Sequence, residues 1–256
     1  MPDRSTKNRP VSLLTALLLT STSSAAWAQS HTPKKPADKN ETVQARSLDL
    51  WSQVQGACTI TYTKTAIRMD TPSRNFVLLL KAPQWQAATM NTKTRLVHVC
   101  PPNQWRPNDI HTFSWLRPSA ATGLIPKSFQ ETTLEGLKCR LYKMEIRQKI
   151  ANPTHAWERL IVKEADYWVA EDKVYPPEAA KCFERALALS CVGAIPLKLE
   201  TTNYGMLKKK DELRLVKAQV KTVPKSLFEV PGDYKTVKSI QDISGQASQE
   251  MVDMFK

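Results

Sequence analysis

Glycine is scarce in this sequence, and the common glycine-containing catalytic motifs are missing. Only 7 glycines occur among 256 residues, which leaves little of the tight backbone cradling that binds phosphate groups. The patterns GxGxxG, GxSxG, HExxH and the P-loop are all absent. The sequence therefore gives no support to nucleotide binding, acyl hydrolysis or zinc proteolysis, and we expect a non-enzymatic protein without a cofactor.

Metal and redox motifs are missing as well. His98 and Cys100 fall on the same side of a predicted strand, but two ligands do not define a zinc site, so we interpret them as a structural pair. No CxxC occurs. The five cysteines are Cys58, Cys100, Cys139, Cys182 and Cys191. An odd number leaves at least one thiol unpaired, and the sequence does not determine the pairing.

Long apolar runs are also absent, and the longest one lies near the N-terminus. Arg4, Lys7 and Arg9 precede the apolar stretch 11–19, and Ala26-Trp27-Ala28 follows as a small-x-small cleavage site. This order is typical of a secretory signal peptide, and the stretch is far shorter than the ~20 residues of a membrane span. We therefore expect cleavage after Ala28 and a soluble protein, periplasmic or secreted.

Basic residues outnumber acidic ones. The formal charge is +13, and it becomes +11 without Arg4, Lys7, Arg9 and Asp3 of the predicted signal peptide. A basic exported protein favours anionic partners, such as the envelope surface. The charges are spread along the chain, and 208–210 is the only tight run. This distribution favours a solvated basic surface, and we expect no specific binding to nucleic acid.

Four regions follow from the composition. Residues 1–28 are the signal peptide, and 29–41 form a polar, Pro/Lys-rich leader that we expect to be disordered. Residues 42–240 have the size of one domain, and 241–256 read as a flexible tail. Within 42–54, a loose helical stripe of apolar residues predicts a short N-terminal helix.

After Gly56 the apolar period changes to two, and about nine strands are predicted. The continuous apolar run 76–80 indicates a strand that is covered on both faces. Residues 195–201 and 213–220 pair as a predicted hairpin. Residues 103–128 are predicted to form an irregular loop that carries aromatic side chains.

One main helix is predicted over Pro177–Ser190. Proline suits its first turn, and Gly193 suits its end. One face is apolar and includes Ala179, Cys182, Phe183, Ala186 and Leu187. The predicted fold class is mainly β (α+β), a large curled antiparallel sheet, or incomplete barrel, closed by this helix.

Three segments resemble a known family: DYWVAED…PPEAAKCFERAL before and within the helix, GAIPLKLETT after it, and VPKSLFEVPGDYKTV near the end. They are similar to exported bacterial proteins of the lipoprotein-carrier (LolA/LolB-like) superfamily, in its uncharacterised branch. The resemblance implies a half-barrel domain over 42–240 with an apolar interior for acyl chains. It also implies an arginine near the mouth of an early strand, for which Arg68 and Arg74 are candidates.

The first functional hypothesis is a binding protein for a hydrophobic or amphiphilic ligand, or for the acyl chains of a lipoprotein. The expected lining residues are Trp85, Trp105, Trp115, Tyr167, Phe183 and Leu187. The alternative is an envelope structural or interaction module, in which all six are ordinary core and no ligand cavity exists. A hydrolase is a third reading, but the sequence offers no nucleophile and base as a candidate pair.

Overall fold

The computed structural model describes residues 41–105, 123–171, 174–179, 182, 185 and 195–243. These residues belong to one compact unit, Asp38–Lys256. The predicted signal peptide (1–28), almost all of the leader and most of the C-terminal tail lie outside them. In the described part, no helix has the length and apolar character needed to cross a membrane.

The described residues are mostly β, with very little helix. The strands are β1 (Thr42–Ser52), β2 (Gly56–Tyr62), β3 (Ala66–Thr71), β4 (Phe76–Lys81), β5 (Gln86–Asn91), β6 (Leu96–Cys100), β7 (Leu124–Leu134), β8 (Leu137–Ile146), β9 (Val162–Ala170), β10 (Ile195–Asn203), β11 (Lys210–Pro224) and β12 (Lys235–Thr236). The short 3-10 helices are η1 (Pro72–Arg74), η3 (Glu158–Leu160), η4 (Pro177–Ala179) and η5 (Lys225–Phe228).

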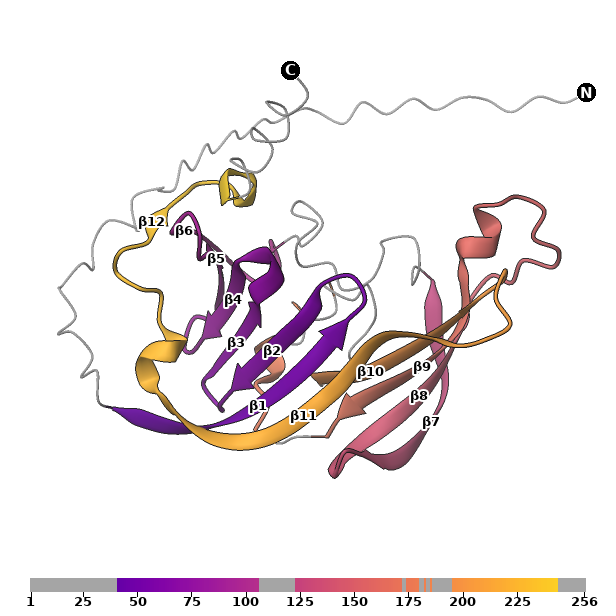
Figure 1. The fold of residues 1–256 in the computed structure, drawn as a ribbon, viewed down its shortest axis with the longest axis horizontal. Helices are drawn as coiled ribbons and strands as arrows, with labels where there is room; N and C mark the ends of the chain where they lie inside the picture. The colour runs from indigo at the N-terminus through magenta and orange to yellow at the C-terminus, as the bar shows by residue number, and fades with distance from the viewer. Residues whose placement is uncertain are drawn as a thin grey trace, which may run out of the picture. The chain divides into compact units, whose positions relative to one another are not determined.

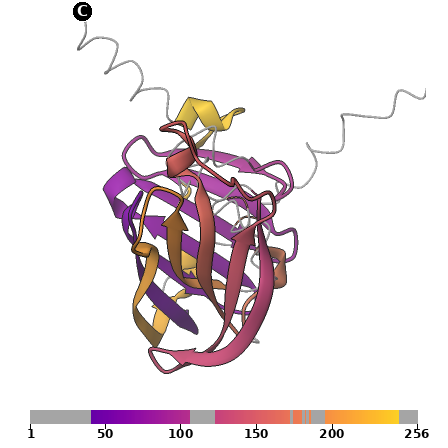
Figure 2. The ribbon, with the colours of Figure 1, turned by 90° about the vertical axis from the view of Figure 1, so that its right-hand side faces the viewer.

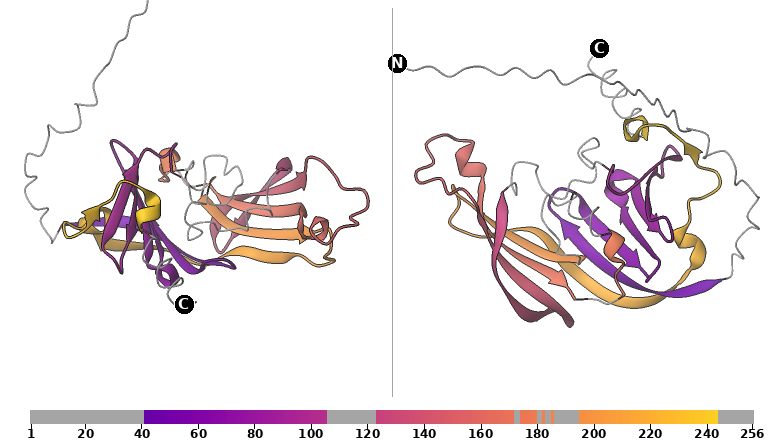
Figure 3. Two further views of the ribbon diagram at one scale, coloured as in Figure 1. Left: turned by 90° about the horizontal axis from the view of Figure 1, so that it is seen from above. Right: turned by 180° about the vertical axis from the view of Figure 1, so that it is seen from behind.

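All twelve strands form one sheet in the order β12-β6-β5-β4-β3-β2-β1-β11-β10-β9-β8-β7. The long strands β1 and β11 lie in its middle (Figure 1), and the views in Figure 3 show strands β7–β10 continuing the sheet beyond β11. The sheet is not closed, because its edge strands β12 and β7 each pair with one neighbour among the described residues. The predicted large antiparallel sheet is confirmed for ten of the eleven strand pairings in the described residues, and only the two-residue strand β12 runs parallel to its neighbour β6.

The first half of the sheet is buried on both faces. In β4, Phe76, Leu78 and Leu80 belong to the main core, whereas Val77 and Leu79 belong to a second core on the opposite face. Phe228 of η5 joins that second core. This arrangement explains the continuous apolar run of β4 and confirms the prediction that this strand is covered on both sides.

The predicted N-terminal helix is wrong, because the segment forms β1. It pairs with β11 on one side along its whole length, and with β2 on the other side from Arg46 to Ser52. Leu48 and Leu50, two residues apart, both enter the main core. Ladder pairing on both sides outweighs the loose helical spacing of the apolar residues, because tertiary context overrides local propensity.

The predicted main helix that closes the sheet is not supported. Within Pro177–Ser190, the structure describes η4 and two further residues, Cys182 and Arg185, both helical, so a continuous helix over this range is not shown. Ala179 and Cys182 are buried in the main core, as their place on the predicted apolar face requires. The other residues of that face, including Phe183 and Leu187, lie outside the described residues.

Arg185 fixes this segment to the end of β6. Its guanidinium donates hydrogen bonds to the carbonyl oxygens of Pro102 (2.5 Å), Asn103 (2.6 Å) and Trp105 (2.8 Å). Charged donors make the stronger hydrogen bonds. Through these contacts one side chain joins two parts of the chain that are about eighty positions apart in sequence.

Two further predictions concern the second half of the sheet. The hairpin of 195–201 with 213–220 is confirmed, since Leu199 pairs with Leu213. The loop predicted over 103–128 is wrong in its last part, because β7 begins at Leu124. β7 is an edge strand whose residues are mostly exposed, so it lacks the alternating apolar pattern that signals a strand.

Candidate functional site

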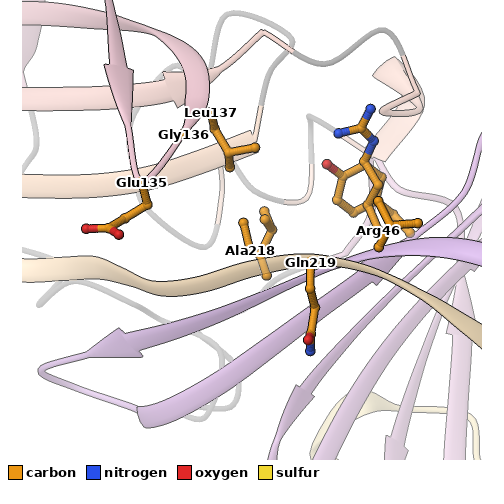
Figure 4. Close-up of a pocket in the computed structure, with 9 residues that line it drawn as sticks. Arg46, Glu135, Gly136, Leu137, Ala218 and Gln219 are labelled. Carbon is orange, nitrogen blue, oxygen red and sulfur yellow. The ribbon is translucent and has the colours of Figure 1, made fainter.

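A pocket of about 260 Å³ opens on the core face of the sheet. Its walls come from β1, β2, β11 and the turn between β7 and β8 (Figure 4). The lining residues are Arg46, Leu48, Tyr62, Glu135, Gly136, Leu137, Ala218, Gln219 and Val220. It is the candidate ligand site of the described part of the chain.

Strand register brings the floor of this pocket together. Leu48 of β1 lies opposite Ala218 of β11. One step along the same face, Arg46 lies opposite Tyr62 of β2 and Val220 of β11. Residues directly opposite each other on antiparallel strands share a face, so the pocket continues the face that carries the main core.

The turn between β7 and β8 forms the opposite wall. Leu134 pairs with Leu137, which leaves a two-residue loop of Glu135 and Gly136. Both have positive φ, 46° and 76°, as a type I′ hairpin turn requires. Glycine adopts this conformation without steric cost. Gly136 therefore favours the tight two-residue turn that lies at the pocket just before Leu137.

The pocket requires the sheet to curl. β8 is the third strand from β11 in the sheet order, and strands lie ~4.8 Å apart, so a flat sheet would separate them by roughly 14 Å. Yet Gly136 lines the same pocket as Ala218 of β11. The sheet therefore bends toward its core face between β11 and β8.

The pocket is lined by apolar side chains in its interior and by charged side chains at its sides. Figure 4 shows Leu137 and Ala218 between Arg46 on one side and Glu135 on the other. The Glu135 carboxylate and the Gln219 amide point away from Leu137 and Ala218. Arg46 is the one cationic residue among those that line the pocket, and this combination suits an amphiphile with an anionic end.

Three of the six predicted lining residues are described, and none of them lines this pocket. Trp105 and Tyr167 are fully buried in the main core. Trp85 is half-buried in the turn between β4 and β5, where it packs on that core. Trp115, Phe183 and Leu187 lie outside the described residues.

Neither arginine suggested by the family resemblance lines the pocket. Arg68 pairs with Asp70 at 2.7 Å and donates to the Leu227 carbonyl oxygen of η5, so it supports the second core. Arg74 is exposed in η1 and donates to the Val54 carbonyl oxygen. Sequence reasoning missed Arg46 because its segment was interpreted as a helix, and it missed the Glu135-Gly136 turn because β7 was not recognised.

The four cysteine thiols of the described residues lie inside the protein. Cys58, Cys100, Cys139 and Cys182 are buried and unbridged. Burial raises the pKa of Cys58 to about 12, and burial also raises that of Cys182 to about 12, because the charged thiolate is poorly solvated there. Among the described residues, no group of three or more His, Cys, Asp or Glu side chains could hold a metal ion.

A charged cluster lies on β9, away from the pocket residues. The Asp166 carboxylate accepts hydrogen bonds from the ammonium groups of Lys143, at 2.8 Å, and Lys209. Burial alone would raise the pKa of Asp166, but the two ammonium groups outweigh it and hold the pKa below its ordinary value of 3.8. The cluster has two cations for one anion, which keeps the Asp166 carboxylate in its charged form.

Comparisons with known proteins leave the family open. No family model matches the chain, and no curated protein matches it. Solved structures that it resembles include an uncharacterized conserved protein from Thermus thermophilus (8% identity, 76% of this chain and 90% of that one, TM-score 0.32). Others are a LolA superfamily protein from Nitrosomonas europaea (8%, 74% and 90%, 0.21) and a DUF1329 family protein from Desulfovibrio piger (8%, 75% and 91%, 0.22). All three TM-scores are below 0.5, so the resemblance to the lipoprotein carriers stays a prediction.

Proposed function

We propose that this protein is an exported, non-enzymatic binding protein for an amphiphile. The apolar chain of the amphiphile lies in the pocket, and its anionic end lies at Arg46. The observation that carries this proposal is the combination of an apolar lining, formed by Leu48, Leu137 and Ala218, with a guanidinium at one side. Ligand sites are typically apolar with a few placed polar groups. The proposal includes the acyl chains of a lipoprotein as a ligand.

The size of the pocket limits the ligand. Its 260 Å³ lies just below the ~300–1,000 Å³ of sites that enclose a drug-sized molecule. One end of a single acyl chain fits such a space, whereas a whole phospholipid does not. A fatty acid is therefore the appropriate first probe.

The test is uptake of a fluorescent fatty acid by the purified protein, together with mass spectrometry of its organic extract. We expect saturable binding that Ala218→Trp weakens at least about tenfold, because the indole fills the floor of the pocket. Gln219→Trp is the matched control, since that side chain points away from Leu137 and Ala218 (Figure 4). Arg46→Gln should weaken a fatty acid more than the corresponding alcohol.

An envelope module with a filled interior is the second candidate, and the packing of the main core favours it. Tyr62, Trp105 and Tyr167 are fully buried, and the ring of Tyr175 meets that of Tyr62 edge-on at 6.0 Å. Absence of any copurified lipid, with no saturable uptake by the wild type, would reject the binding proposal and leave this one.

A further inference from the structure

Two loops at one end of the sheet are joined into a single unit, the tip (residues 147–161 and 203–210). The first loop connects β8 to β9, and the second is the turn between β10 and β11 together with the adjoining residue of each strand, Asn203 and Lys210. Backbone hydrogen bonds run from Tyr204 N to Ile161 O (3.1 Å) and from Gly205 N to Arg159 O (3.0 Å). The Tyr204 hydroxyl also accepts from Ile150 N at 2.8 Å. Figure 2 shows η3 above strands β7–β10, and Figure 1 shows its loop beside the β10–β11 turn.

The two loops approach each other closely. A Cβ atom on Gly205 would lie 2.9 Å from the Arg159 Cβ, which is closer than side chains tolerate. Asn203 Nδ2 adds a hydrogen bond to the Leu160 carbonyl oxygen at 3.0 Å. The side chains that the tip presents are therefore held on a defined backbone.

The tip exposes large apolar side chains. Nine large hydrophobic residues are exposed in the described part of the chain, and four of them lie here. They are Trp157 (61% exposed), Leu160 (63%), Met206 (37%) and Leu207, whose side chain is wholly in solvent. Single exposed apolar residues are ordinary, but clusters of them mark surfaces that bind a partner or a membrane.

Basic residues accompany this cluster. The two loops carry six of them, Arg147, Lys149, Arg159, Lys208, Lys209 and Lys210, against the single acidic residue Glu158. The Glu158 carboxylate is occupied, because it accepts hydrogen bonds from Thr154 N and His155 N. Ion pairs engage Lys149, Lys209 and Lys210. Arg147, Arg159 and Lys208 form none with the described residues, so positive charge is available beside the apolar side chains.

We propose that this tip docks the protein reversibly on the surface of an anionic phospholipid membrane. Tryptophan and leucine next to lysine and arginine are the combination that inserts at the boundary between head groups and acyl chains. Negative lipids attract such basic segments. A protein partner of ordinary affinity needs about 800 Å² on each side, whereas two turns offer a few projecting side chains, which suit a fluid surface better.

This proposal goes beyond ligand binding in the pocket and does not depend on it. The test is flotation of the purified protein, with its N-terminus established by mass spectrometry, on phosphatidylcholine vesicles with and without phosphatidylglycerol. We expect binding only when phosphatidylglycerol is present, and weaker binding as salt is added. Trp157→Ser and Leu207→Ser should each weaken it at least about tenfold.

Matched controls separate the tip from the general surface. Val216→Ser removes an apolar side chain of β11 that is 59% exposed and should change nothing. Lys208→Gln should weaken binding, whereas Lys64→Gln, in the exposed turn between β2 and β3, should not. Leu207 makes no buried contact, so Leu207→Ser is expected to fold normally.

Three outcomes would overturn the proposal. The first is equal binding to vesicles with and without phosphatidylglycerol, and the second is a Leu207→Ser variant that floats like the wild type. The third is concentration-dependent self-association in ultracentrifugation that Leu207→Ser abolishes, because the tip would then bind a second copy of the chain. Leu207→Ser should retain fatty-acid uptake and Ala218→Trp should retain vesicle binding, so the two proposals fail independently.

Discussion

The indole nitrogen of Trp105 donates a hydrogen bond to the hydroxyl oxygen of Thr89 at 3.0 Å, and neither side chain has any exposed surface. Thr89 lies in β5, and Trp105 follows the end of β6. Thr89 is a polar residue among apolar ones, and the indole provides the partner that its burial requires. The pair thus joins the loop after β6 to the core face of the sheet.

We predict that Trp105→Phe and Thr89→Val will each lower the free energy of unfolding by about 1–3 kcal/mol, because each leaves one buried polar group without its partner. The double variant should lose less than the sum, since both partners are then gone. Urea denaturation of the four proteins measures the coupling. If the double variant instead loses the sum of the two single losses in unfolding free energy, the two side chains are not coupled and the hydrogen bond does not contribute to stability.

Asp166→Asn tests the charged cluster on β9. The variant should lose roughly 1–2 kcal/mol of stability at neutral pH, because Lys143 and Lys209 lose their shared anion. The pKa of Asp166 is held below 3.8 in the folded protein. Its contribution is therefore complete above the unfolded-state pKa and disappears as the pH falls through the lower folded-state value.

Thermal denaturation between pH 3 and pH 7 checks this expectation. The difference between wild type and Asp166→Asn should be constant near neutrality and narrow at the acidic end. Glu164→Gln is the control on the same strand, since that carboxylate is half-exposed and 4.0 Å from its only ion-pair partner in the described residues, Lys163. A difference that widens toward low pH would contradict the assignment.

Arg185 should act as a clamp on the residues after β6. Two guanidinium nitrogens of Arg185 reach the three carbonyl oxygens, and the single ammonium nitrogen of lysine does not reproduce this planar fork. Arg185→Lys is therefore expected to lower stability by about 1–3 kcal/mol and to increase amide exchange around Trp105. Hydrogen-exchange mass spectrometry measures both the loss of stability and the faster amide exchange around Trp105. Arg214→Lys, which removes an exposed guanidinium stacked on Trp51 at 5.1 Å, should leave that segment unchanged.

Thiol labelling tests the burial of the cysteines. In a Cys191→Ser background, four thiols remain, and all four are buried in the folded protein. Because the thiolate is the reactive form, pKa values of about 12 for Cys58 and Cys182 predict negligible labelling at pH 8. Four thiols should react after unfolding without reductant, and a count of two would indicate a disulfide instead.

The parts of the fold that sequence predicted well are those with local signals. The apolar run of β4 and the β10–β11 hairpin follow from residue periodicity, which acts within each segment. The helix expected at β1 failed because Leu48 and Trp51 happen to be three residues apart, and nothing local reveals that β2 and β11 lie on both sides. Propensity could not outweigh pairing that involves residues far away in sequence.

The candidate site was beyond sequence reasoning for a related reason. Arg46, Gly136 and Ala218 come from three separate parts of the chain. Pairing of β1 with β11 brings Arg46 and Ala218 together, and Gly136 joins them only because the sheet curls. Five of the six predicted site residues were large aromatic side chains, and the sixth was Leu187. Trp105 and Tyr167 instead fill the core, where their size is most useful for packing.

The two edges of the sheet differ in a way that bears on solubility. At one edge of the sheet, the segment around β12 covers β6. Lys235 N donates a hydrogen bond to Arg95 O, and Val237 N donates one to Val97 O. At the other edge, β7 is eleven residues long and pairs only with β8 in the described part of the chain. An open edge is a template for aggregation. This edge is interrupted by a proline without a backbone N–H and by two charged side chains, Pro126, Lys127 and Glu131. These residues break the apolar alternation by which β7 could have been predicted. They also oppose the pairing of a further strand at this edge.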